Sequence, residues 1–370
     1  MPFSSLVRRG TEFASDHFAK NPDKKPEITA SPWLIALLAV TSLTLILVFW
    51  AVEYTYGMVV STLAAVEDST PDIYVRIDSD FDPNKPADSS DPEPEPEAAP
   101  VRSKPITSTL RTTTKHLRSR AGPWSRFRGF SLFLVYCLAN GFLSSMFSSF
   151  PANYFLIQFA VQTVVGVILA PLQLAWVHIV ISEPSPKRFY QRIPGHKAWA
   201  KIAPVAAFEH AVTGAAFYLP MAIAKGLGGW EAFNSSPDMP PAKTACHALS
   251  VVTGPSLLGF LVSIPARAIF VRVAASMLPE EDEAIVPFDR SFGGKVVPAI
   301  LGGSGKLSIL DAWRTFDRAA LIRFLKVIAK VFMIEFALIF GFALAFVAEL
   351  YAIGGDTVHK MTGSIVQQGN

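Results

Sequence analysis

Long apolar runs alternate with polar segments along this chain of 370 residues. Residues 33–52 form the clearest run, in which only three residues are polar. Twenty residues of helix extend about 30 Å, which matches the hydrocarbon thickness of a bilayer. No proline follows before Ala65. We therefore expect a first transmembrane helix within residues 31–66.

Five further apolar segments are long enough to cross a membrane. They are residues 129–149, 154–182, 201–224, 244–278 and 319–351. Pro171 and Pro265 lie inside two of them, and a proline removes a helical hydrogen bond, so we expect a bend at each. The pattern predicts an all-α integral membrane protein with about six transmembrane helices, five of them within residues 129–351.

The other segments are polar. Residues 1–30 and 352–370 are expected to be polar tails. Residues 67–128 are acidic in their first half and basic in their second, with few large apolar side chains, so we expect a disordered loop. Two interpretations of its basic half remain open, a solvated linker and a surface that contacts anionic lipid headgroups.

The distribution of positive charge along the chain is consistent with an even number of membrane crossings. Lys and Arg concentrate in the segments between the first and second, third and fourth, and fifth and sixth apolar runs, and they are scarce in the other two connections. The positive-inside rule places the three basic segments on one side of the membrane. Both termini are then expected on the other side.

Composition narrows the function classes. Hydrophobic residues make up 51% of the chain and charged residues 17%, against about a quarter charged in soluble domains. The net charge of +3 gives no indication of nucleic acid binding. Cys137 and Cys246 show neither a CxxC pair nor metal-ligand spacing, and the chain contains no GxSxG or HExxH motif. We therefore expect no metal, no cofactor and no enzymatic activity.

Three prolines stand about 100 residues apart and begin similar stretches. Pro71 opens PDIYVRIDS, Pro171 opens PLQLAWVHIVIS and Pro265 opens PARAIFVRVAAS. In each stretch an aromatic residue precedes a basic or imidazole side chain. This pattern predicts three pseudo-repeated helix pairs with equivalent bends at the prolines. Coincidence among the 28 prolines of the chain is the alternative.

This arrangement of three helix pairs resembles the mitochondrial carrier family, in which odd-numbered helices end at a Pro-x-acid-x-x-base motif. The stretch LSILDAWRTFDRAALIRFLKV at residues 307–327 resembles the short helix that precedes an even-numbered span in that family. The acidic positions hold Ile73, Gln173 and Arg267, so the family's ring of salt bridges cannot form. The chain thus resembles a degenerate carrier, which implies a mitochondrial membrane or otherwise an endomembrane.

The chain also resembles uncharacterised fungal multispanning proteins that are labelled "ubiquitin carrier protein". Ubiquitin transfer needs a reactive cysteine, and neither Cys137 nor Cys246 has an acid-base partner in its neighbourhood. The resemblance therefore supports a multispanning membrane protein and gives no support to ubiquitin chemistry.

Charged residues inside the apolar segments are the candidates for function, because a charge in the membrane is costly unless it is paired or hydrated. The candidates are Glu209, His210, Arg267 and Glu335. They are consistent with a polar cavity for a small anionic or zwitterionic solute, or with structural pairs. Arg267 cannot lose its charge, so we expect it to face the helix bundle and to pair with Glu209 or Glu335.

Other basic residues in the spans are expected to reach the headgroups instead. Arg272, Lys326 and Lys330 have long aliphatic stems that can extend towards the membrane surface. Two functions remain open on the sequence. One is a carrier-like transporter, and the other is a non-transporting scaffold or insertase-type adaptor that organises an organelle membrane.

The six-span topology is directly testable. Cysteines introduced at Ser5 and Ser364 should label from the same side of the membrane, and a cysteine at Ser90 should label from the opposite side. Labelling of Ser5 and Ser364 positions from opposite sides with an impermeant reagent would show an odd number of spans.

Overall fold

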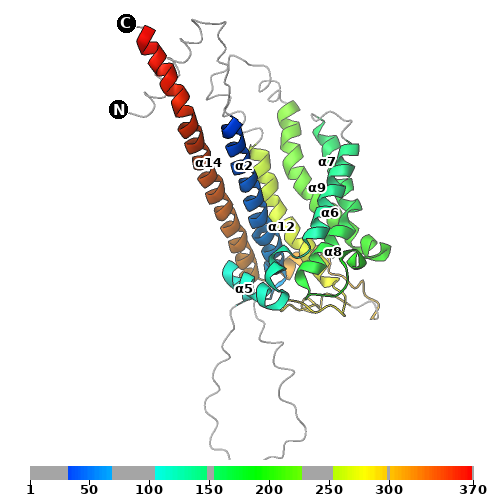
Figure 1. The fold of residues 1–370 in the computed structure, drawn as a ribbon. Helices are drawn as coiled ribbons and strands as arrows, with labels where there is room; N and C mark the ends of the chain where they lie inside the picture. The colour runs from blue at the N-terminus through cyan, green and yellow to red at the C-terminus, as the bar shows by residue number, and fades with distance from the viewer. Residues whose placement is uncertain (1–31, 69–104, 148–153, 227–252, 298–300, 369–370) are drawn as a thin grey trace, which may run out of the picture. The chain divides into compact units, whose positions relative to one another are not determined.

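Figure 1 shows a computed structural model of the chain, which describes residues 32–68, 105–147, 154–226, 253–297 and 301–368. Within these ranges the regular structure is helical, apart from one isolated bridge between Ser182 and Ala284. The helices long and apolar enough to cross a membrane are Ala36–Val66, Pro123–Met146, His196–Gly226, Gly254–Ser276 and Arg318–Glu349. The helices Phe155–Ile168 and Ala170–Ile181, which are bent by 55° at the break between them, make a sixth if the two together form one span. The predicted all-α membrane fold is confirmed.

The described residues fall into two compact units. The first contains those up to Phe49 together with those from Phe336 onwards, which belong to α2 (Pro32–Val52) and α14 (Arg318–Gln368). The polar tail expected from residue 352 continues α14 as helix, and residues 1–30 lie outside the description. The hydroxyl of Thr41 donates to Oε1 of the Glu349 carboxylate at 2.5 Å, which pairs two polar groups of helices with apolar sequences.

The second unit runs from Trp50 to Glu335. It begins in α2, which passes into the π-helical turn η1 (Glu53–Val60) and then into α3 (Ser61–Val66). π-helical turns are rare and frequently mark functional positions. The buried core includes Leu63 of α3.

Five helices build most of the second unit: α6 (Phe130–Met146), α7 (Phe155–Ile168), α8 (Ala170–Ile181), α9 (His196–Gly226) and α12 (Gly254–Ser276). The central helix α9 packs against both α7 and α12, while α6 packs against α7 and α8 (Figure 1). Leu174 of α8 and Phe270 of α12 are fully buried. The sequence predicted each of these segments, and residues 244–252 of the segment that contains α12 lie outside the described residues.

Pro171 and Pro265 do not make equivalent bends. Pro171 lies in the first turn of α8, directly after a break where the helix axis turns by 55° from α7. Pro265 lies inside α12, which continues without a break. A proline in a first turn costs no helical hydrogen bond, whereas an internal proline removes one. The expected equivalence is therefore wrong for this pair, and Pro71 lies outside the described residues.

The segment from residue 105 to residue 128 is helical and not disordered as expected. It contains η2 (Ile106–Ser108), α5 (Leu110–Ala121) and η3 (Pro123–Phe127), while residues 69–104 lie outside the description. The Thr109 hydroxyl caps α5 by accepting from the Thr112 amide. Glu67 holds the start of the segment, because its carboxylate accepts the amides of Ile106 at 2.6 Å and Thr107 at 2.9 Å. Local composition does not show such a distant partner.

Arg272 ties three helices together at one end of the second unit. Its guanidinium donates to the carbonyls of Ala65 at 3.1 Å, Ala312 at 3.0 Å and Thr315 at 3.0 Å. These carbonyls lie near the C-terminal ends of α3 and of α13 (Ile309–Arg314), where a helix leaves carbonyls unpaired. Only 4% of Arg272 is exposed, so the expectation that it extends to the headgroups is wrong.

A second buried arginine, Arg323, lies at the same end of the second unit. Arg323 of α14 is buried, donates to the Glu67 carbonyl and lies 3.8 Å from the Glu67 carboxylate. The neighbouring Asp68 carboxylate accepts the Asp289 amide, and burial raises the pKa of Asp68. We call Glu67, Arg272 and Arg323 with these partners the helix-end network. Lys326 and Lys330, by contrast, are exposed.

Replacing Arg272 with Met should lower the stability of the protein by at least about 3 kcal/mol, because several buried carbonyls lose their donor. Thermal unfolding in detergent measures this effect. Arg314 is the matched control, since it is exposed on the neighbouring α13. Equal melting temperatures for Arg272→Met and Arg314→Met would show that the helix-end network contributes no stability.

Candidate functional site

Arg267 and Glu209 form an ion pair between α12 and α9. Arg267 Nη1 lies 3.2 Å from Glu209 Oε1 and 3.3 Å from Gln173 Oε1. The guanidinium also lies over the rings of Phe270 and Trp176, with 5.1 Å and 5.7 Å to the ring centroids. The predicted acidic partner of Arg267 is confirmed, and it is Glu209.

His210 joins the same group through Gln173. The Gln173 amide donates to the Tyr136 hydroxyl at 2.7 Å and lies 3.3 Å from His210 Nε2. The imidazole lies against Gly166 of α7, where an added Cβ would meet His210 Cδ2 at 2.1 Å. A glycine is therefore required at residue 166 for this position of the ring.

Glu335 lies apart from this ion pair. Its side chain lines a cavity together with Glu53 of η1, and the carboxylate paired with Arg267 is that of Glu209, so the alternative in which Glu335 is the ion-pair partner of Arg267 is wrong. Glu53 folds back over Gly57, where an added Cβ would meet Glu53 Oε2 at 2.4 Å. Gly57 has no side chain and so leaves space for the Glu53 carboxylate, as Gly166 does for the His210 ring.

Two cavities meet at Arg267. The Glu335 cavity has a volume of about 230 Å³ and is lined by Glu53, Arg267 and Glu335 among mostly apolar side chains. The His210 cavity has a volume of about 270 Å³ and is lined by Glu209, His210 and Arg267, with Gln173 and Tyr136. Arg267 and Trp176 line both. The structure thus brings all four candidate residues to the walls of two neighbouring cavities.

Sequence reasoning missed three members of this group. Gln173, Tyr136 and Trp176 line the cavities, but amides and aromatic residues are common in transmembrane helices and carry no distinct signal there. Gln173 stands two residues after Pro171, a position that the carrier comparison singled out only because it lacks an acid. Within the described residues, no group of three His, Cys, Asp or Glu side chains could hold a metal ion.

No family model, curated protein or solved structure matches this chain. The resemblance to mitochondrial carriers therefore remains an interpretation of the sequence. The chemistry of the site rests on the residues themselves.

Gly166→Ala should displace the His210 ring and lower stability by about 1–3 kcal/mol, because the added methyl group has no space. Gly141→Ala in α6 is the matched control, since an added Cβ at Gly141 meets no atom within 4 Å. Melting temperatures in detergent compare the two. A Gly166→Ala protein as stable as Gly141→Ala would contradict the close packing of His210 on α7.

Proposed function

We propose that this multi-pass protein binds a small zwitterionic solute at Arg267 and carries it across its membrane. The observation that supports the proposal is the exposure of a charge pair inside the bundle. The Arg267 side chain keeps 31% of its surface exposed, and Glu209 keeps 12%, although they form an ion pair. A purely structural pair in the membrane is expected to be enclosed, while a pair that contacts a solute borders a cavity.

The charges of the Glu335 cavity favour a zwitterion over a simple anion. The cavity presents one guanidinium, from Arg267, and two carboxyl groups, from Glu53 and Glu335. Arg267 can bind a carboxylate of the solute, while the acidic pair can accept an ammonium group. A solute with negative charge alone would meet repulsion from the acidic pair. Because the chain resembles mitochondrial carriers, the proposal places it in a mitochondrial membrane or otherwise in an endomembrane.

A non-transporting scaffold or insertase-type adaptor is the second candidate. Alternating access requires each end of the bundle to open in turn. The helix-end network opposes opening at one end, because Arg272 and Arg323 are buried and donate to backbone carbonyls of other elements. That observation favours a protein that keeps one arrangement of its helices.

Ligand-induced stabilisation distinguishes the two functions. Purified protein is melted in the presence of a panel of free amino acids as zwitterionic probes, and of succinate as an anionic probe. We expect at least one amino acid to raise the melting temperature, and Arg267→Ala to abolish that increase because the solute loses its carboxylate partner. The best probe is then tested for uptake into proteoliposomes.

Glu335→Gln and Glu349→Gln form the matched pair of controls. Glu335 lines the cavity, whereas Glu349 bonds to Thr41 in the first unit. The effect of the probe should weaken in Glu335→Gln and persist in Glu349→Gln. Stabilisation without uptake would favour the scaffold, and an absence of stabilisation by every probe would contradict a zwitterion site.

A further inference from the structure

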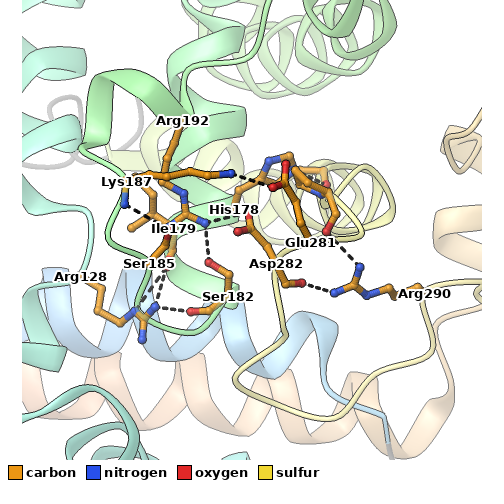
Figure 2. Close-up of polar contacts among 12 residues, drawn as sticks. Arg128, His178, Ile179, Ser182, Ser185, Lys187, Arg192, Glu281, Asp282 and Arg290 are labelled. Carbon is orange, nitrogen blue, oxygen red and sulfur yellow. Dashed lines mark hydrogen bonds and ion pairs between the residues drawn. The ribbon is translucent and has the colours of Figure 1, made fainter.

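A separate basic pocket lies where α6 begins and α8 ends. It has a volume of about 270 Å³ and is bounded by η3, the first turn of α6, the end of α8 and the loop that contains η4 (Phe189–Arg192). Three cationic residues line it, Arg128, Lys187 and Arg192. Figure 2 draws all three together with their polar contacts. None of them lines the cavities at Arg267, so this site does not depend on the proposed function.

Arg128 leaves part of its guanidinium unpaired. Its Nε and Nη2 donate to the Ile179 carbonyl at 3.3 Å and 3.0 Å, and Nη2 also donates to the Ser182 carbonyl (Figure 2). Its Nη1 is buried and has no hydrogen-bond partner among the described residues, and the same is true of Ser125 Oγ, which lines the pocket. Buried donors without partners are costly. Two of them at one pocket indicate a ligand rich in acceptors.

The charges around the pocket point to an anion. The nearby carboxylates each pair with another cation: Glu281 with Lys187 at 3.0 Å, Asp282 with Arg192 at 3.0 Å and Glu183 with Arg120 at 3.2 Å. Arg128 has no carboxylate in an ion pair with it among the described residues, and it donates to the neutral carbonyls of Ile179 and Ser182. Its positive charge therefore has no directly paired carboxylate among the described residues.

We infer that this pocket binds the phosphate group of an anionic phospholipid. A guanidinium binds phosphate with several directed hydrogen bonds, and Arg128 Nη1 with Ser125 Oγ supplies two donors at the pocket. The ammonium of Lys187 lies at the rim, where its side chain is 44% exposed. Basic pockets beside transmembrane helices at a membrane surface suit such headgroups.

The surface next to the pocket supplies a place for the acyl chains. Ser131 lines the pocket, and the same face of α6 continues with Leu134, Leu138 and Phe142 at helical spacing. These three side chains are 47%, 66% and 63% exposed. Trp124, which is 79% exposed, lies at the rim as interfacial aromatic residues do. A soluble phosphate would use the pocket alone, while a phospholipid uses the pocket and this apolar face.

The test uses the full-length protein in detergent and follows its melting temperature. Three probes are compared: dioleoylphosphatidic acid, dioleoylphosphatidylcholine and inorganic phosphate. Lys187→Gln and Arg128→Gln alter the pocket. Lys115→Gln and Arg111→Gln are their matched controls, because both residues are exposed on α5 outside the pocket. Among the described residues, the Lys187 ammonium bonds only to the exposed Glu281. The Lys187→Gln variant therefore still tests the site if Arg128→Gln fails to fold.

Phosphatidic acid should stabilise the unaltered protein more than phosphatidylcholine does. Its half-maximal concentration should rise about tenfold in Lys187→Gln, the loss expected for one charge-assisted hydrogen bond, and stay unchanged in Lys115→Gln. A shift by inorganic phosphate that depends equally on Lys187 would retain the phosphate site and overturn its assignment to lipid. Equal responses of Lys187→Gln and Lys115→Gln, or equal effects of the two lipids, would overturn the site itself.

Discussion

The unpaired carbonyls at helix C-termini are the constraint on which the second unit depends. In apolar surroundings such carbonyls have no water to bond, and arginine and histidine side chains from other elements supply the donors. Arg272 serves the ends of α3 and α13, Arg128 serves the end of α8, and His178 Nε2 donates to the Ala274 carbonyl near the end of α12 at 2.9 Å. Because each donor belongs to a different element from its acceptor, the bonds that complete the helix ends also join the helices.

The same helix carries two arginines with opposite roles. Arg272 is buried and its donors are taken up by carbonyls, whereas Arg267, five residues earlier on α12, borders two cavities. Glycines make the second role feasible, because Gly57 and Gly166 leave the space that Glu53 and His210 occupy. One end of the unit is thus joined by buried hydrogen bonds, while Arg267, about one and a half helical turns away, borders the cavities.

The buried hydrogen bonds at this end bear on both candidate functions. A transporter with a fixed network would need its moving parts elsewhere in the bundle. A scaffold would need no moving part, and the basic pocket at Arg128 would then attach the unit to anionic lipid. The pocket at Arg128 and the ion pair at Arg267 are separate features of the structure. Lipid binding at the first and solute binding at the second can therefore each be correct without the other.

The sequence by itself determined the membrane class, the apolar spans and the need for an acidic partner at Arg267, because hydropathy over some twenty residues and the cost of an unpaired charge are local properties. Only the tertiary structure decided which acid pairs with Arg267, that Arg272 is buried, and that residues 105–128 form helices. Each of these depends on a partner distant in sequence: Glu209 for Arg267, Ala312 for Arg272 and Glu67 for Ile106. No local pattern encodes such a partner, since folding alone brings the two groups together.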